Sequence, residues 1–181
     1  MAKIKLSKIE AARRQIDSAI RMLFANEDPV SIYTIAAAGS RILNDLAEKK
    51  GDIDVHQKFK DIIRPGMEKE FWFHMNKPAN FLKHADRGPD SILSDFDEEA
   101  NDWTLFFACY YYRDLGFTLT PEMNSLLYWM ILLHPKILND DYPLKKELMS
   151  ISIPITNMSR AKKLELGRLS LEKNKRVHKG F

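Results

Sequence analysis

Apolar side chains recur every three or four residues near the start of the chain, the spacing that marks one face of an α-helix. Charged and polar side chains fill the positions between them, as expected for a helix with its other face toward water. The apolar positions are Ile9, Ala12, Ile16, Ile20 and Leu23. The pattern therefore predicts a first helix over residues 8–24.

Proline, glycine and short polar side chains divide the rest of the chain into further helices. Asp28 and Pro29 are typical of an N-cap followed by a first helical residue, and Gly51 ends the helix that they begin. Thr120 and Pro121 form the same start signal later in the chain. The pattern predicts helices over residues 29–50, 54–63, 68–75, 79–85, 97–115 and 120–134.

Segments that alternate apolar and polar residues between turn signals, as half-buried strands do, are absent from the sequence. Residues 151–155 are the only strand-like stretch, and Pro154 disfavours a strand there. A chain of 181 residues without an internal repeat fits one domain with an extension. The sequence therefore predicts an all-α fold: a bundle of about six helices at residues 1–141, then a basic, partly flexible C-terminal extension at residues 142–181.

The middle of the second predicted helix, Ala36-Ala-Ala-Gly-Ser40, has almost no side-chain bulk. A neighbouring helix can approach it closely, which indicates a position at the centre of the bundle; alternatively, its backbone contacts a ligand. The apolar runs at residues 106–112 and 126–133 cover more than one helix face. We expect both to be buried on several sides and one of them to form the interface of a homodimer.

The net charge of +3 is unevenly distributed. From Arg160 to the end there are eight Lys or Arg against two Glu, a charge of +6, which leaves −3 for residues 1–159. Residues 160–175 fit either a basic amphipathic helix through Leu164, Leu166 and Leu171 or a flexible solubilising tail. Clustered cations of this kind also bind nucleic acid through its phosphates.

The composition of the chain indicates in which cellular compartment it resides. Cys109 is the single cysteine; its apolar surroundings predict a buried, unreactive thiol, and the lack of a disulfide framework favours a reducing compartment. The N-terminal residues lack the apolar stretch of a signal peptide, and the longest apolar run is far shorter than the ~20 residues that span a bilayer. We expect a cytoplasmic protein without membrane association.

The five histidines lack metal-site spacing, and no glycine-rich phosphate loop is present, so no metal or cofactor is expected.

One segment, Lys77-Pro-Ala-Asn-Phe-Leu-Lys-His-Ala-Asp-Arg87, combines groups that can act on a phosphodiester. If residues 79–85 are helical, Asn80 and His84 are four residues apart and lie on one helix face. A neutral imidazole can remove the proton of a ribose 2′-hydroxyl while cations hold the phosphate, which cleaves RNA without a metal. The surrounding cations are Lys77, Lys83 and Arg87.

The core of this segment, Asn80-Phe-Leu-Lys-His84, resembles the motif of HEPN domains, a class of small all-helical proteins. Their motif is often Arg-Asn-x-x-x-His, so Asn80 and His84 match its second and last positions, while Ala79 stands in place of Arg. The resemblance spans residues 8–116 by helix order. It implies a homodimer that binds RNA or a nucleotide, and in many members a metal-independent ribonuclease of a defence or toxin–antitoxin system.

The resemblance implies a role for each residue of the segment. His84 is the base, Asn80 orients the phosphate or the sugar, and Lys77, Lys83 and Arg87 bind the nucleic acid or offset its charge. Two other interpretations remain open. In the first, His84 pairs with Asp86 or a backbone carbonyl and the segment is purely structural. In the second, the protein is a non-enzymatic interaction module whose apolar helices bind a protein partner.

Overall fold

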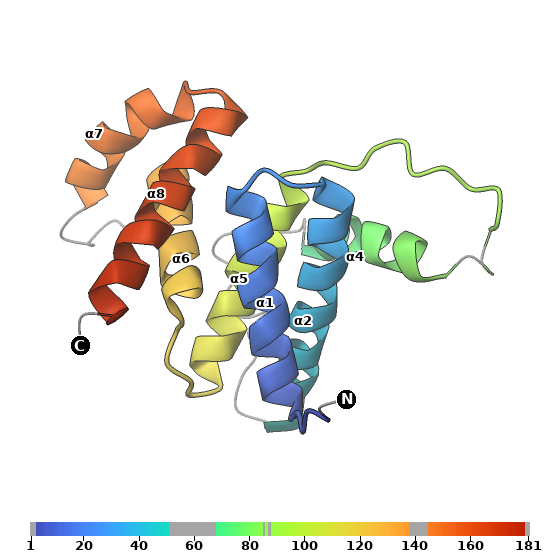
Figure 1. The fold of residues 1–181 in the computed structure, drawn as a ribbon. Coiled ribbons are helices and arrows are strands. Elements are labelled where there is room, and N and C mark those ends of the chain that lie inside the picture. Colours follow the sequence, from blue (N-terminus) through green and yellow to red (C-terminus); the bar gives the residue numbers. More distant parts are fainter. Residues whose placement is uncertain (1–2, 51–67, 85, 87, 138–144, 180–181) are drawn as a thin grey trace.

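A computed structural model of the chain describes residues 3–50, 68–84, 86, 88–137 and 145–179 (Figure 1). Within these ranges the structure contains seven α-helices and one short 3-10 turn, and it contains no strand. The helices are α1 (Lys8–Phe24), α2 (Pro29–Lys50), α4 (Glu68–Lys83), α5 (Ala100–Asp114), α6 (Pro121–Leu133), α7 (Lys145–Thr156) and α8 (Arg160–Lys179). The predicted all-α fold is confirmed, with a helix number close to the expected six.

The caps read from the sequence form as expected. The backbone N–H of Ser31 donates to the Asp28 side chain over 2.7 Å at the start of α2. The backbone N–H of Met123 donates to the Thr120 hydroxyl over 3.2 Å at the start of α6. Each cap satisfies a backbone donor that the first turn of a helix leaves unpaired. The predicted starts of these two helices are therefore confirmed.

Helices α1, α2 and α5 pack together, and α4 lies beside α2 on the side away from α1 (Figure 1). The small residues of α2 permit this arrangement. Gly39 faces α1 so closely that a Cβ there would lie 2.9 Å from the Ile16 Cδ1 atom, and Ala36 beside it is fully buried. The predicted close approach is confirmed, and α1 is the helix that makes it.

The region around Pro78 differs from the expectation of two helices at 68–75 and 79–85. The structure has one helix, α4, which continues through Pro78 and ends at Lys83. A proline inside a helix costs a backbone hydrogen bond and some steric strain. Pro78 is itself buried, so packing of its ring offsets part of that cost. The helix predicted at residues 54–63 lies outside the described residues.

The C-terminal region resolves the choice left open by the sequence, because residues 160–179 form the long helix α8. It packs along α6 and also touches α1 (Figure 1). Leu164 and Leu171 are buried as an amphipathic helix requires, whereas Leu166 is 38% exposed and faces outward. The strand-like stretch 151–155 belongs to helix α7, again with a proline inside it. The predicted division into residues 1–141 and 142–181 stays a prediction.

Polar contacts fix α8 at several points along its length. Arg160 donates two hydrogen bonds, of 2.8 and 2.9 Å, to the buried carboxylate of Asp102 on α5. The indole N–H of Trp129 donates to the backbone carbonyl of Lys163 over 2.6 Å. Asn174 donates to the Ser125 hydroxyl over 2.8 Å. Because these donors and acceptors lie in or beside the core, separating α8 from α6 would leave several of them unpaired.

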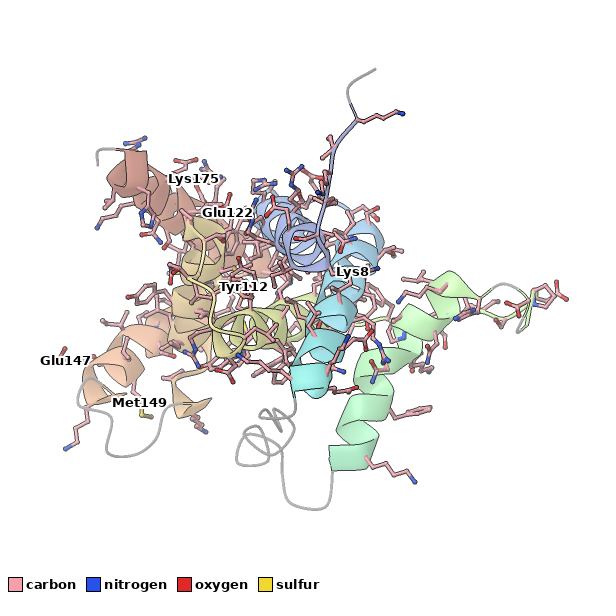
Figure 2. The ribbon with its side chains drawn as sticks, turned by 90° about the horizontal axis from the view of Figure 1, so that it is seen from below. Lys8, Tyr112, Glu122, Glu147, Met149 and Lys175 are labelled. Carbon is pink, nitrogen blue, oxygen red and sulfur yellow. The ribbon has the colours of Figure 1, made fainter. Side chains whose placement is uncertain are left out.

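One carboxylate joins three helices. Glu122 on α6 accepts from Arg21 of α1 over 2.9 Å and from Lys175 of α8 over 2.8 Å, and Figure 2 shows Lys175 and Glu122 side by side. Burial raises the pKa of Glu122, but the hydrogen bonds from Lys175 and Arg21 outweigh it, so the pKa lies below its usual value of 4.5. The folded state therefore favours the charged carboxylate.

Cys109 and the apolar runs of α5 and α6 are accounted for within the chain. Cys109 is fully buried, and burial raises the pKa of its thiol, so the predicted inert thiol is confirmed. The run 126–133 packs against α8, α7 and α5, and only Tyr128 in it is largely exposed, at 64%. These apolar faces find partners without a second copy of the chain, and the homodimer stays a prediction.

Gly167→Ala is expected to lower the free energy of unfolding by about 1–3 kcal/mol, measured by urea denaturation. A Cβ at this position would overlap the ring of Phe24, which lies against the α8 backbone. In an unobstructed helix the same substitution stabilises by about 1 kcal/mol. In a Phe24→Leu background the cost should therefore shrink or change sign. An equal cost in both backgrounds would contradict this packing of α8 on α1.

Glu122→Gln is expected to lower the free energy of unfolding at neutral pH by about 1–2 kcal/mol, because Gln accepts the two cationic hydrogen bonds only weakly. Since the folded pKa lies below the unfolded one, the carboxylate stabilises above pH 4.5 and loses this effect as the pH falls through the folded pKa. The difference in the free energy of unfolding between the wild type and Glu122→Gln should therefore disappear in acid. Glu147→Gln on α7, where Figure 2 places Glu147 away from Glu122, is the control and should change stability by less than about 0.5 kcal/mol.

Candidate functional site

Helices α2, α4 and α5 enclose an open pocket of about 430 Å³, which we call the α2–α4–α5 pocket. Three helices contribute side chains to it. From α2 come Tyr33, Ala37, Ser40, Arg41, Asn44 and Glu48. From α4 come Asn76, Ala79, Asn80 and Lys83, and from α5 come Thr104, Phe107 and Tyr111. The volume lies within the range of small-molecule sites in proteins, about 300–1,000 Å³.

The floor of the pocket is aromatic and buried. Tyr33, Phe107 and Tyr111 expose only 1%, 2% and 4% of their surface. Burial raises the pKa of Tyr33 to about 12, although interactions of its hydroxyl with the Ala79 backbone and with Thr104 act in the opposite direction. Tyr33 is therefore a neutral phenol at physiological pH. Its contacts reach from α2 to α4 and α5, so it holds together the three helices that form the pocket.

The rim of the pocket is polar and carries two cations. Arg41 is largely exposed and pairs with Asp45 over 2.8 Å, one turn along α2. Lys83 is exposed and has no ion-pair partner among the residues that the structure describes. The Asn44 side chain donates to Glu48 over 2.6 Å, so the one carboxylate of the lining is already engaged by an amide. The rim thus offers positive charge and carboxamides above an aromatic floor.

The segment singled out in the sequence contributes part of this lining. Asn80 and Lys83 both lie in the last turn of α4 and line the pocket. Ala79, where the motif that this segment resembles has Arg, also lines it. A longer side chain at residue 79 would therefore extend into the pocket.

His84 lies just beyond the end of α4. Because α4 ends at Lys83, the helix expected over residues 79–85 stops before His84, and the expected placement of Asn80 and His84 on one helix face stays a prediction. The imidazole is 40% exposed, and its Nδ1 atom lies 3.9 Å from the exposed carboxylate of Asp86. His84 does not line the pocket, but it follows directly on a residue that does.

Lys77 pairs with an exposed carboxylate, and its predicted contact with nucleic acid stays a prediction. Its ammonium group lies 2.9 and 2.8 Å from the two carboxylate oxygens of Asp95. This contact ties α4 to the segment that returns from the far end of α4 to α5 (Figure 1). The next residue, Phe96, packs its ring edge-on to Tyr33, with centroids 5.6 Å apart. Lys77 is not part of the pocket lining, and Arg87 lies outside the described residues.

Sequence reasoning missed the contribution of α2, whose polar lining residues follow at helical spacing: Ser40, Arg41, Asn44 and Glu48. In a sequence this pattern cannot be distinguished from the solvated face of any surface helix. The only sequence feature that pointed to this part of α2 was the stretch 36–40, which was expected to pack against another helix or, alternatively, to contact a ligand. The structure divides the stretch between packing and the pocket: Gly39 faces α1, whereas Ala37 and Ser40 line the pocket.

The described residues contain no group of three or more His, Cys, Asp or Glu that could hold a metal ion. In the same part of the chain, none of the helices combines the length and apolar character needed to cross a membrane. No protein-family model, no curated protein and no solved structure matches this chain.

Proposed function

We propose that the α2–α4–α5 pocket binds a ribonucleotide, either free or as one unit of single-stranded RNA. The observation that carries the proposal is the combination of Arg41 and Lys83 at the rim, carboxamides beside them, and an aromatic floor below. A nucleotide presents the matching groups: an anionic phosphate, a base edge with donors and acceptors, and an apolar base face. The volume of about 430 Å³ suits a ligand of this size.

Arg41 and Lys83 would bind the phosphate. The guanidinium group of Arg41 can donate two parallel hydrogen bonds to phosphate oxygens, and the Lys83 ammonium group adds a point charge. The present pair of Arg41 with Asp45 is exposed on both sides, at 68% and 52% of the side-chain surface. Exposed pairs of this kind contribute little free energy. Arg41 can therefore turn from Asp45 to a phosphate at little cost.

Asn44 and Asn80 would recognise the base or the sugar. Each carboxamide offers one acceptor and two donors, which suits the hydrogen-bonding edges of an unpaired base. The two residues come from opposite walls, α2 and α4, so a flat ligand between them can contact both. Tyr111 and Phe107 line the pocket from α5 and expose only 4% and 2% of their surface, so they add a small apolar contact for the base.

The resemblance to HEPN domains supports the same site, because Asn80, Lys83 and Ala79 of the motif segment all line the pocket. It also suggests weak metal-independent cleavage when the ligand is RNA. In that step His84 accepts the proton of the ribose 2′-hydroxyl, the oxygen attacks the adjacent phosphorus, and the 5′-oxygen leaves with a proton from water. With Ala79 in place of Arg, Arg41 and Lys83 are the cations of the described pocket lining that could stabilise the developing charge.

Arg41→Ala and Lys83→Ala are each expected to weaken binding of AMP and of a short single-stranded RNA at least tenfold. Charge-assisted hydrogen bonds of this kind contribute about 1.5–3 kcal/mol. Isothermal titration measures the AMP affinity, and fluorescence anisotropy measures the affinity for labelled RNA. Loss of RNA binding alone would identify RNA, rather than a free nucleotide, as the ligand.

The matched control is Lys69→Ala, since Lys69 is an exposed cation on the same helix that does not line the pocket. It should leave both affinities within about twofold. An equal loss for Lys69→Ala and Lys83→Ala would mean that only general positive charge attracts the ligand. Wild-type protein that binds neither AMP nor RNA would refute the proposed function.

Ala79→Arg is expected to raise the rate of RNA cleavage in EDTA above that of the wild type, and His84→Ala is expected to abolish it in both backgrounds. The new guanidinium group would extend into the pocket, where it can stabilise the developing charge. Gel analysis of labelled RNA measures the rate, and Lys69→Ala, which leaves the proposed site intact, should cleave at the wild-type rate. Cleavage that persists in His84→Ala would contradict the role of His84 and leave the binding proposal standing.

A further inference from the structure

Helix α8 presents an outward face that α6 does not cover. Its inward face is formed by buried residues, Leu164, Gly167 and Leu171, spaced as one side of a helix requires. On the opposite side, Leu166, Leu169 and Val177 remain 38%, 49% and 54% exposed. These three residues follow one another at helical spacing and so form a stripe on one side. We call this side the α8 outer face.

The α8 outer face is also cationic. Lys162, Lys173 and Arg176 are exposed and alternate with the apolar stripe, and none of them has an ion-pair partner within the described ranges. The two acidic residues of the helix lie on its flank and are both engaged by Arg168, with Glu172 at 2.5 Å and Glu165 at 3.9 Å. The positive charge of the face is therefore not neutralised from within the helix.

We propose that the α8 outer face binds an amphipathic helix of another protein whose polar positions are acidic. The apolar stripe would pack against the apolar side of such a helix, and the unpaired cations would form its rim pairs. The stripe spans 12 residues from Leu166 to Val177, which corresponds to about 16 Å of helix between its ends, or three turns. A partner helix of three to four turns can cover it.

The face is fixed before any partner arrives. The bonds from Arg160 to Asp102 and from Trp129 to the Lys163 carbonyl hold the inward side of α8 against α5 and α6. A face that is already ordered loses little conformational entropy on binding, which favours affinity. Its short stripe and three cations suit a modest interface rather than an obligate one.

The residues of the α8 outer face disfavour three other ligands: a second copy of the chain, single-stranded RNA and a membrane. A second copy docking through the same face would bring Lys and Arg against Lys and Arg, because a two-fold contact joins like with like. Single-stranded RNA binds with aromatic stacking, and residues 160–179 contain no aromatic residue other than His178. Helices that lie on membranes keep their cations on the side opposite their apolar residues, whereas Lys162 and Lys173 lie among the apolar residues of this face.

The test uses the full-length protein and two synthetic helical peptides of about four turns. Both carry leucines at positions i, i+3, i+7 and i+11; one has Glu at its polar positions and the other has Lys. Fluorescence anisotropy of the labelled peptides measures binding. We expect the Glu peptide to bind and the Lys peptide to bind at least tenfold more weakly. Equal binding of both, or no binding of either, would overturn the proposal.

Charge reversal locates the interaction on α8. Lys173→Glu should weaken binding of the Glu peptide at least tenfold, whereas Lys146→Glu, which reverses an exposed cation on α7, should change it less than threefold. Reversal of Lys162, Lys173 and Arg176 together should make the protein prefer the Lys peptide. All three residues are exposed, so the fold should tolerate the changes, and circular dichroism checks this. Equal effects of Lys173→Glu and Lys146→Glu would overturn the proposal.

Two further experiments distinguish a membrane or a nucleic acid from a protein helix as the ligand of the α8 outer face. Vesicles of phosphatidylcholine with phosphatidylserine and a labelled single-stranded RNA are each titrated against wild type and Leu169→Asp. The proposal expects Leu169→Asp to abolish binding of the Glu peptide and to leave any vesicle or RNA affinity unchanged. Vesicle or RNA binding that disappears with Leu169→Asp, while the Glu peptide does not bind, would assign the face to a membrane or to nucleic acid instead.

Discussion

The close approach of α1 to α2 at Gly39 is the constraint on which the candidate site depends. With no side chain at this position, the Ile16 side chain of α1 lies directly on the α2 backbone. This contact fixes the rotation of α2 about its own axis. The face that carries Ser40, Arg41 and Asn44 then points away from α1, toward α4 and α5. A helix must bury one face, and here the burial of the small-residue face determines which polar residues reach the pocket.

Burial and charge act together where α8 joins the bundle. Burial raises the pKa of Asp102 to about 6 although Arg160 donates two hydrogen bonds to it, so this carboxylate bears a real cost of desolvation. A buried ion pair of this kind adds little net stability compared with an apolar contact, but it is costly to break, which favours one position of the helix. Arg160 and Lys175 pair with carboxylates of the bundle. The cations on the opposite side of α8 remain open to a partner.

The periodicity and the caps were sufficient to predict α1, α2, α5 and α6, because each of these helices has a single apolar face or a clear start signal. The expectation of separate helices before and after Pro78 was wrong, since tertiary packing can offset one lost backbone bond. The sequence could not decide the state of α8. Its leucines at 164, 166 and 171 suit a helix in either setting, and Gly167, which allows Phe24 to approach, is ordinarily unfavourable in a helix.

The sequence also predicted only some of the residues that line the pocket. Asn80 and Lys83 were predicted because they belong to a recognisable segment, and both line the pocket. Arg41 and Asn44 carried no such signal, because only the packing of α2 distinguishes them from other solvated residues. The position of His84 depends on where α4 ends, and helix ends are set by local competition among a few hydrogen bonds that a sequence pattern does not resolve.

Ala79 connects the volume of the pocket with the chemistry expected of it. In the family that the segment resembles, this position carries the guanidinium group that stabilises charge during cleavage; in this chain the position is a methyl group at the pocket wall. The small Ala79 side chain leaves space for a ligand, but it provides no positive charge near the phosphate of the proposed ribonucleotide. Catalysis requires groups that bind the transition state better than the ground state, whereas Arg41 and Lys83 at the rim can bind both equally. With Ala79 in the pocket wall, the proposed ribonucleotide would therefore be retained rather than cleaved rapidly.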